Sequence, residues 1–346
     1  MGLVPGIEVL EAFAPLRGTQ EVAAYGAGHI HDTFLIKAKE DQFILQRFNH
    51  HVFTQPQEVG ENIARVSAHL KNKMRESYPY DYQSRYLQII SSGNQPFFQD
   101  AQGLYWRLFR YVPETMTIDF VERPQQAREA ARAFGEFVRL LGDLEPKSFH
   151  ATIPHFHDLR YRLAQLEGAI QQADLQRKQS AVDLLERLPK AANNLLSQIP
   201  FSSLPLRLLH NDTKINNLLF DQQSLKAKCV IDLDTVMPGY LLYDFGDLVR
   251  TSVSLSAEDE QDLTKIVVRS EILEALEDGF VAGLGKAFRE AEIQSLKYGG
   301  PYMALIMATR FLTDYLQGDP YYKTNRPAHN LDRARNQFRL FELLTC

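Results

Sequence analysis

The sequence predicts an α+β fold in which a small β-rich lobe precedes a larger, mostly helical lobe. Short apolar runs separated by turn residues fill the first third of the 346-residue chain, a pattern typical of antiparallel strands. Long segments with apolar residues at helical spacing follow Val112 and Pro113. The change of pattern at this point predicts two domains, residues 1–112 and residues 113–346.

The first domain is expected to contain a small antiparallel sheet and one helix. Three strand-like runs at residues 21–25, 33–38 and 43–48 follow one another as a meander. A helical segment then carries apolar residues from Val59 to Leu70 on one face. Two more strands are expected at residues 86–90 and 104–112, separated by a turn at residues 91–94.

The second domain is predicted to be helical, with one β-like island. Helical spacing runs through residues 127–141, 159–173 and 180–197, and returns from about residue 263 to the end. The island consists of residues 206–209, 217–220 and 228–233. A helical domain that carries a short polar hairpin is therefore expected.

Composition excludes several classes of function. Lysine and arginine (38) nearly balance aspartate and glutamate (43), and no basic run suited to a nucleic-acid backbone occurs. Two cysteines, Cys229 and Cys346, can build neither a disulfide framework nor a cysteine zinc site, which indicates a reducing compartment. Neither a secretory signal nor a run of roughly 20 apolar residues is found. We therefore expect a soluble, cytoplasmic protein with no nucleic-acid or membrane partner.

The strongest motif lies in the β-like island. Asp212 and Asn217 are five residues apart across a tight loop and can converge, and Asp232 and Asp234 are expected on one face of a strand end. Phosphoryl transfer needs a carboxylate that orients and deprotonates the attacking hydroxyl, and ligands that fix Mg²⁺ on the phosphates. Oxygen ligands of this kind suit Mg²⁺ rather than zinc.

The pattern His-x-Asp, four residues, Asn, followed by a strand ending Ile-Asp-x-Asp, resembles the aminoglycoside phosphotransferase superfamily, the small-molecule relatives of protein kinases. The sequences of residues 210–217, 230–239 and 243–247 are similar to those of the N-acetylhexosamine 1-kinase branch. Residues 28–34, 43–49, 106–109 and 309–316 also resemble that branch. The resemblance implies a bilobal protein-kinase-like fold, with a nucleotide-binding lobe at 1–112 and a catalytic, acceptor-binding lobe at 113–346.

The resemblance assigns roles to four residues and implies ATP as co-substrate. It makes Asp212 the catalytic base, Asn217 and Asp232 the Mg²⁺ ligands, and Asp234 a metal ligand or a neighbour of the phosphate site. A cap on a helix or turn is the alternative for Asp212. His210 is interpreted as a packed residue that shapes the loop. Asp244 and Asp247 could serve the site, or Asp244 could cap the next helix and brace the loop.

A nucleotide-binding loop is expected between the first two strands. Gly26, Gly28 and His29 lie in a strand–loop–strand context, which argues against a dinucleotide fold, where the glycines open a helix. The strand at residues 43–48 has no lysine, so Arg47 could supply the nucleotide-facing cation and pair with Glu61 or Glu58. If Gln46 faces inward instead, Arg47 is merely solvated.

Five polar residues are candidates for binding the acceptor: His31, Asp32, Lys214, Asn216 and Arg310. His29 is a further candidate, and surface turns are the alternative for His29, His31 and Asp32. Arg310 lies on an apolar helical stretch, where an unpaired guanidinium is expensive, and its alternative is an ion pair with Asp314.

The resemblance implies a small-molecule acceptor, namely an amino sugar, N-acetylglucosamine or N-acetylgalactosamine, phosphorylated at its anomeric hydroxyl. Two alternatives stay open. One is a kinase for an aminoglycoside, choline or an amino alcohol, which would need an acidic pocket. Residues 251–290 hold nine acidic and four basic side chains, although a solvated helix face explains this equally well. The other alternative is a nucleotide-binding protein without catalysis. The sequence does not indicate the oligomeric state.

Overall fold

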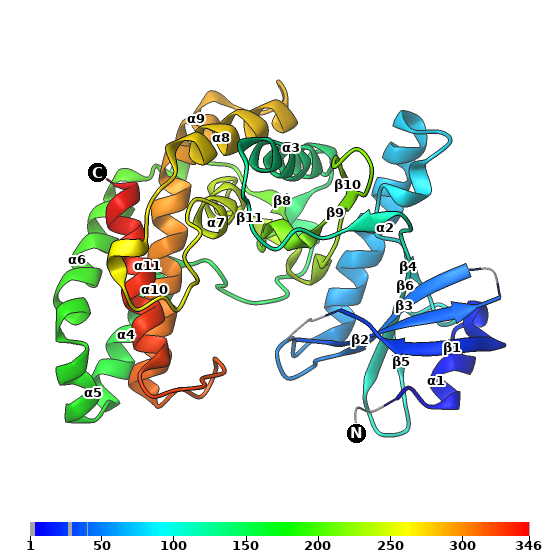
Figure 1. Ribbon diagram of the computed structural model, residues 1–346, viewed down its shortest axis with the longest axis horizontal. Coiled ribbons are helices and arrows are strands. Elements are labelled where there is room, and N and C mark those ends of the chain that lie inside the picture. Colours follow the sequence, from blue (N-terminus) through cyan, green and yellow to red (C-terminus); the bar gives the residue numbers. More distant parts are fainter. Residues whose placement is uncertain (1–3, 27–29, 40, 346) are drawn as a thin grey trace. The chain divides into compact units, whose positions relative to one another are not determined.

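The computed structural model describes residues 4–26, 30–39 and 41–345 (Figure 1). The chain forms two compact units, each assembled from three stretches. Unit 1 comprises Met1–Thr117, Leu140–Ile153 and Leu218–Pro238, and unit 2 comprises Ile118–Arg139, Pro154–Asn217 and Gly239–Cys346. The predicted α+β fold is confirmed, with an antiparallel sheet near the N-terminus and a larger helical part. The predicted domain division after residue 112 stays a prediction.

Unit 1 contains a six-stranded antiparallel sheet in the order β1-β2-β3-β6-β4, with β5 also paired to β6. The strands are β1 Thr19–Ala24, β2 Asp32–Ala38, β3 Asp41–Phe48, β4 Ile89–Ile90, β5 Phe98–Gln99 and β6 Tyr105–Arg110. The predicted meander and the two later strands are confirmed. Strand β5 was not predicted, because two residues are too few to show alternation.

One face of this sheet holds the core of the N-terminal region. Phe34 and Ile36 of β2, Leu45 of β3 and Leu108 of β6 are buried there, beneath the short helix α1 Ile7–Ala12 (Figure 1). The prediction of a single helix in this region is therefore wrong. Helix α1 was missed because its six residues bury only Val9, which leaves no periodic signal.

The second helix of the region, α2 Pro56–Ser77, confirms the predicted helical segment. Its buried face includes Val59 and Leu70, as expected from the spacing. Asn62 is fully buried on the same helix, and its Nδ2 donates to the carbonyl oxygens of His150 (2.9 Å) and Val236 (3.0 Å). One amide group therefore ties together all three stretches of unit 1.

The predicted polar hairpin is also confirmed. It is formed by β9 Leu218–Asp221 and β10 Ala227–Val230, and β7 Thr115–Met116 extends it to three strands. The strand ends at Val230, so the expectation that Asp232 and Asp234 alternate along a strand is wrong. Asp232 adopts a left-handed conformation (φ 58°), and Asp234 lies in the 3₁₀ turn η6 Leu233–Thr235. This turn, and not strand alternation, sets the direction of both side chains.

Unit 2 is built from helices. They are α3 Pro124–Leu140, α4 Leu159–Gln172, α5 Leu175–Ser180, α6 Val182–Gln198, α7 Leu242–Ser252, α8 Ser270–Leu284, α9 Glu290–Ser295, α10 Gly299–Gln317 and α11 His329–Leu344. The helix expected at 180–197 is confirmed as α6, whereas α5, which ends just before it, was not predicted. Helix α10 is buried on most sides and packs against α4, α7 and α11 (Figure 1).

Short elements complete the chain. Strand β8 Arg207–Leu209 ends just before residues 210–217, and strand β11 Met237–Gly239, which pairs with β8, comes before α7. The remaining 3₁₀ turns are η1 Ala14–Leu16, η2 Tyr82–Ser84, η3 Pro146–Ser148, η4 Phe201–Ser203, η5 Ile215–Asn217, η7 Leu263–Lys265 and η8 Leu296–Tyr298. Among the helices of the described ranges, none has the length and apolar character required to span a bilayer.

A glycine permits the close packing of α7 on α10. A Cβ on Gly246 would lie 2.2 Å from the carbonyl oxygen of Gly299, so no larger residue fits without backbone movement. This contact fixes α7, the helix that carries Asp244 and Asp247.

Candidate active site

The loop after β8 is held by a buried carboxylate. Both oxygens of Asp244 accept backbone N–H groups, from His210 at 2.9 Å and from Asn211 at 2.7 Å. Asn211 is left-handed (φ 62°), so this clamp holds the loop in a conformation that few residues adopt readily. Asp244 is fully buried. Its carboxylate therefore braces the loop. This was one of the two roles that the sequence analysis considered for Asp244.

The predicted convergence of Asp212 and Asn217 is confirmed. The Nδ2 atom of Asn217 lies 3.1 Å from Oδ2 and 2.8 Å from the carbonyl oxygen of Asp212. The other carboxylate oxygen of Asp212 lies 2.9 Å from Nζ of Lys214. These contacts of the carboxylate are with side chains and not with the first turn of a helix, which disfavours the alternative role as a cap.

Asp212 is held in its ionised form. Burial raises the pKa of its carboxyl group, but the charge and hydrogen bond of Lys214, together with the charges of His210 and Arg250, bring the pKa below its usual value. In turn, Asp212 raises the pKa of Lys214. The loop therefore presents an ionised carboxylate, the form that a proton acceptor needs.

Two histidines support this loop through their contacts. The buried ring of His210 packs edge-on against Phe134 and Phe137, and its Nδ1 accepts the backbone N–H of Asp212 at 3.3 Å. The interpretation of His210 as a packed, loop-shaping residue is confirmed. His157, which the sequence did not single out, donates from Nε2 to the carbonyl oxygen of Asn211 at 2.9 Å.

Asp247 belongs to an ion-pair network on α7. Its Oδ1 accepts from Nε (3.1 Å) and Nη2 (2.9 Å) of Arg250, which also donates to Glu258 at 2.8 Å. The Oδ2 atom of Asp247 is buried and has no hydrogen-bond partner within the described parts of the chain. The charge of Asp247 raises the pKa of Lys214. The sequence analysis named Asp247 as a candidate for the site, and its position near Lys214 agrees with that prediction.

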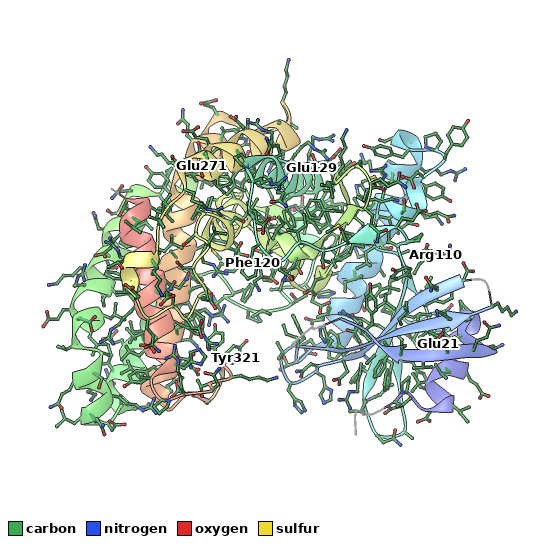
Figure 2. The ribbon with its side chains drawn as sticks, in the orientation of Figure 1. Glu21, Arg110, Phe120, Glu129, Glu271 and Tyr321 are labelled. Carbon is green, nitrogen blue, oxygen red and sulfur yellow. The ribbon has the colours of Figure 1, made fainter. Side chains whose placement is uncertain are left out.

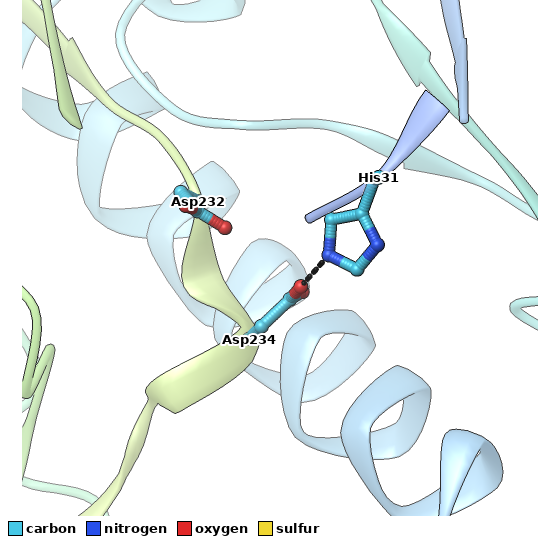
Figure 3. Close-up of side chains that lie close together, drawn as sticks. All are labelled: His31, Asp232 and Asp234. Carbon is cyan, nitrogen blue, oxygen red and sulfur yellow. Dashed lines mark hydrogen bonds and ion pairs between the residues drawn. The ribbon is translucent and has the colours of Figure 1, made fainter. Parts of the chain in front are cut away.

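Unit 1 brings together a second group of polar side chains. One ligand atom each from His31, Asp232 and Asp234 lie within 4.8 Å of one another (Figure 3). His31 Nε2 lies 2.6 Å from Asp234 Oδ2. His31 Nδ1 accepts the backbone N–H of Asn49 at 3.0 Å, so Nε2 carries the proton and donates to Asp234. Both ring nitrogens are thus in use, and the predicted acceptor-binding role of His31 stays a prediction that these contacts do not support.

Arg107 is a buried partner of this second group that the sequence reasoning missed. It is 1% exposed on β6, and its two terminal nitrogens donate to the two carboxylate oxygens of Asp234. These contacts, with that of His31, lower the pKa of Asp234 against the effect of burial, which raises it. A signal existed, because an arginine inside the apolar run of a central strand is unusual and requires a buried partner.

The strand alternation decides between Gln46 and Arg47. Gln46 pairs with Arg107 across β3 and β6, and its Oε1 accepts from Nε of Arg107 at 2.9 Å. Arg47 points to the opposite face and forms an ion pair with Asp32 at the strand end. The expected pairing of Arg47 with Glu61 or Glu58 is wrong, since Arg47 pairs with Asp32. Both glutamates instead lie beside His150, at 2.9 Å and 3.9 Å. Nucleotide-binding roles for Arg47 and Glu61 stay predictions.

The other predicted site residues are distributed as follows. Gly26 is left-handed (φ 74°) at the end of β1, whereas Gly28 and His29 lie outside the described residues. Asp32 is exposed and pairs with Arg47, and Asn216 is exposed in η5. The roles assigned to these residues stay predictions.

Arg310 is surrounded by aromatic rings and not by a carboxylate. Its guanidinium carbon lies 5.2 Å, 5.9 Å and 5.5 Å from the ring centres of Phe156, Tyr321 and Tyr322. Within the described ranges no salt bridge joins it to Asp314, whose oxygens accept the backbone N–H groups of Tyr321 and Tyr322. The alternative of an ion pair with Asp314 is therefore wrong.

A model of the phosphotransferase enzyme family, APH, matches residues 21–271. The chain belongs to this family. The predicted membership in the kinase-like superfamily is thereby confirmed, and Asp212, Asn217, Asp232 and Asp234 all lie inside the matched range.

Solved structures share the fold at low sequence identity. An aminoglycoside phosphotransferase from Alicyclobacillus acidocaldarius is 13% identical, with a TM-score of 0.67 over 100% of this chain and 96% of that one. A microcompartment-associated aminopropanol kinase is 16% identical, with a TM-score of 0.67 over 98% and 95%. A choline/ethanolamine kinase family protein from Mesorhizobium loti is 15% identical, with a TM-score of 0.58 over 98% and 92%.

The donor set of this phosphotransferase fits a hard divalent cation. Mg²⁺ takes carboxylate, amide and water oxygens, and the two predicted ligands, Asp232 and Asn217, carry a carboxylate and an amide. Their role as ligands of Mg²⁺ stays a prediction. His31 is unsuitable, because its Nε2 carries a proton and its Nδ1 is bonded to the backbone. Asp234 already neutralises the guanidinium of Arg107, so a metal would have to compete with that cation. Its predicted role as a metal ligand stays a prediction, and its contacts favour a structural one.

Proposed function

We propose that this phosphotransferase is an ATP-dependent small-molecule kinase that phosphorylates the anomeric hydroxyl of an N-acetylhexosamine. The observation that carries the kinase assignment is the contact between Asp212 and Asn217 on a loop clamped by Asp244. A carboxylate and an amide fixed five residues apart are the parts that phosphoryl transfer requires for its base and for one metal ligand.

Each of these residues would have a separate role in phosphoryl transfer. Asp212 would orient the acceptor hydroxyl and accept its proton as the bond to the terminal phosphorus of ATP forms and the bond to ADP breaks. Asn217 and Asp232 would hold Mg²⁺, which neutralises charge on the phosphates when bound. Lys214, already 2.9 Å from Asp212, would keep that carboxylate ionised until the acceptor arrives.

The choice of an N-acetylhexosamine rests on the resemblance of residues 210–217 and 230–239 to that branch of the family. A cationic acceptor is the alternative, and the names of the aminopropanol kinase and of the choline/ethanolamine kinase family protein favour it. The acidic residues at 251–290 give this alternative little support. Glu258 pairs with Arg250, Asp259 with His329, and Asp278 with Arg128.

A coupled ADP-release assay across N-acetylhexosamines, hexoses, aminoglycosides, choline and aminopropanol tests the proposal. We expect the fastest Mg²⁺-dependent turnover with N-acetylglucosamine or N-acetylgalactosamine, and phosphorus NMR of the product should show an ester at the anomeric carbon. Faster turnover of choline or aminopropanol would show that the acceptor is a cationic alcohol and not an N-acetylhexosamine. The absence of ADP release with every acceptor would favour the remaining alternative, a nucleotide-binding protein without catalysis.

A further inference from the structure

Asn62 is a polar residue on the apolar face of helix α2. It is fully buried, as are Val59 and Ile63 on the same face. A buried amide is costly unless it forms hydrogen bonds, and this one forms three. Its Nδ2 donates to the carbonyl oxygens of His150 (2.9 Å) and Val236 (3.0 Å), and its Oδ1 accepts the backbone N–H of His150 at 3.1 Å. The side chain of Asn62 therefore holds the main chain at two points that are distant in the sequence.

These contacts require an asparagine. The nitrogen of the amide faces two carbonyl oxygens and its oxygen faces an N–H group, so the orientation of the amide is fixed. An ionised aspartate of the same shape would place an oxygen against both carbonyl groups, and a leucine would form none of the bonds. The contacts therefore depend on the amide of Asn62 and not only on its volume.

Val236 closes the turn that Asp232 begins. It directly follows the 3₁₀ turn η6, its N–H donates to the carbonyl oxygen of Leu233 at 3.1 Å, and its own carbonyl oxygen accepts from Asn62. At the other end of the turn, Asp232 is left-handed, a conformation that persists in a non-glycine residue only when the surrounding structure holds it. Helix α2 packs against this turn. Asn62 therefore holds the end of the segment that sets the direction of Asp232.

Helix α2 is itself held by residues 143–150, which lie between α3 and α4 and belong to unit 1. Three side-chain pairs join this segment to the helix along its length: Glu61 with His150 (2.9 Å), Arg65 with Ser148 (2.7 Å) and Lys73 with Asp143 (2.7 Å). The guanidinium carbon of Arg65 also lies 3.8 Å from the ring centre of Phe149. These contacts fix the helix, and with it the amide of Asn62.

The six-stranded sheet contributes no ion pair to α2 among the described residues. The cationic side chains of the described strands all pair elsewhere, namely Lys37 with Glu21, Arg47 with Asp32, Arg107 with Asp234, and Arg110 with Asp41, where Figure 2 labels Glu21 and Arg110. A hydrogen bond from Asn62 to Val236, and not an ion pair with β3, therefore ties the helix to the turn that Asp232 begins.

We propose that Asn62 is a positioning residue for the metal site, which it serves by holding the turn after Asp232 against α2. This inference rests on the proposed function, in which Asp232 is a ligand of Mg²⁺. Without the bond from Asn62, the turn gains conformations in which the carboxylate of Asp232 points in other directions. Because Mg²⁺ binds only the competent conformation, its apparent affinity falls with the fraction of molecules that adopt it.

Binding of ADP by isothermal titration calorimetry, once in EDTA and once in saturating Mg²⁺, tests this role. ADP is suitable because it is the product of the proposed reaction and is not turned over. The measured quantity is the gain in ADP affinity that Mg²⁺ produces. We expect Asn62→Leu to reduce this gain by about 10-fold or more, with the ADP affinity in EDTA within about 2-fold of wild type.

Asn336→Leu is the matched control. Asn336 lies on α11, is 3% exposed, and its Nδ2 also donates to two carbonyl oxygens, those of Ala257 (3.0 Å) and Glu260 (3.4 Å). Leucine at either position should lower the urea midpoint of unfolding, because buried carbonyl groups lose their donor. Only Asn62→Leu should reduce the gain from Mg²⁺. If Asn62→Leu does not fold, Asn62→Ser, which retains one donor, is compared with Asn336→Ser in the same way.

Hydrogen exchange of the metal-free proteins supplies a second measurement. The N–H of Val236 is bonded to Leu233 within the turn, so its exchange reports on the turn directly. We expect the amides of residues 231–237 to exchange at least about 10-fold faster in Asn62→Leu than in Asn336→Leu, because only the first substitution releases the turn. Equal exchange rates in the two variants would contradict the proposal.

The ADP measurement separates this inference from the proposed function. Gains from Mg²⁺ that match in Asn62→Leu and Asn336→Leu would reduce Asn62 to a structural residue and leave the proposed kinase intact. The absence of any gain in the wild-type protein would contradict the proposed metal site, and this inference would then fail together with the proposed function.

Discussion

His31 Nε2 lies 2.6 Å from Oδ2 of Asp234, although 203 residues separate the two in the chain. His31 stands just before β2, and its ring stacks on Phe48 with centres 5.1 Å apart, so the imidazole is fixed from the strand side. Asp234 lies in the turn that follows the left-handed Asp232. The contact therefore anchors the turn that holds Asp234 to the start of strand β2 in the six-stranded sheet of unit 1.

Arg107 completes this anchor, and its removal should strongly destabilise the protein. Arg107→Met would leave the carboxylate of Asp234 buried without its cation, which typically costs about 3–5 kcal/mol. Arg47→Met removes a neighbouring arginine from a half-exposed pair with Asp32 and should cost less than about 1 kcal/mol. Urea unfolding of the two variants tests the contrast, and equal losses would show that the buried pair is not structurally important.

Asp212→Asn should remove the base while sparing nucleotide binding. We expect kcat to fall by about 10²- to 10⁴-fold, with the affinity for ATP close to wild type, because the amide retains the shape of the carboxyl group but accepts no proton. Asp278→Asn, an exposed carboxylate paired with Arg128, is the matched control. Unchanged kcat in Asp212→Asn would exclude the proposed role.

Asp232 and Asp234 should respond differently to the same substitution. Asp232→Asn should weaken Mg²⁺-dependent ATP binding, because a neutral amide is a poorer ligand than a carboxylate for a hard cation. Asp234→Asn should mainly lower the free energy of unfolding, because it breaks the pair with Arg107. Titration of ATP at several Mg²⁺ concentrations, combined with urea unfolding, separates the two effects. The reverse result would exchange the two assignments.

Gly246→Ala should destabilise the helix pair that supports the loop after β8. The new methyl group would meet the carbonyl oxygen of Gly299 at 2.2 Å, and overpacking of this kind costs about 1–3 kcal/mol. Gly168→Ala on α4 is the control, since its methyl group would meet no atom within 4 Å, and alanine there should stabilise the helix by roughly 0.5–1 kcal/mol. Opposite signs of the two changes in thermal unfolding are expected, and equal signs would contradict the close approach.

His157 predicts a pH dependence of stability. Burial lowers the pKa of its imidazole to about 4, although the hydrogen bond to Asn211 acts to raise it. The unfolded chain binds this proton below about pH 6.5, whereas the folded protein binds it only below about pH 4. Stability from this residue is therefore present above pH 6.5 and is lost as the pH falls toward 4, by roughly 3 kcal/mol.

His157→Gln tests this dependence, because glutamine can still donate to the carbonyl oxygen of Asn211 but does not titrate. The difference in unfolding free energy between the wild-type and variant proteins should change between pH 7 and pH 4 in favour of the variant. A constant difference over that range would mean that the imidazole titrates alike in the folded and unfolded states.

The sequence predicted the parts of the site whose geometry is local. Asp212 and Asn217 converge because five residues span one tight loop, and the hairpin at β9 and β10 follows from two apolar runs around a turn. Helix α2 was predicted from its apolar spacing alone. In each case the residues that determine the structure are close neighbours in the chain, so spacing and residue type were sufficient.

The amino-acid sequence by itself thus determined the α+β class, the family motif and the position of the proposed base. Only the tertiary structure decided that Arg107 and not Arg47 is the buried cation, that His31 binds Asp234, and that Arg310 lies among rings and not beside Asp314. Arg107 and Asp234 are 127 residues apart. Alternation along a strand assigns neighbouring side chains to opposite faces, but the partner that each face meets depends on how distant segments pack.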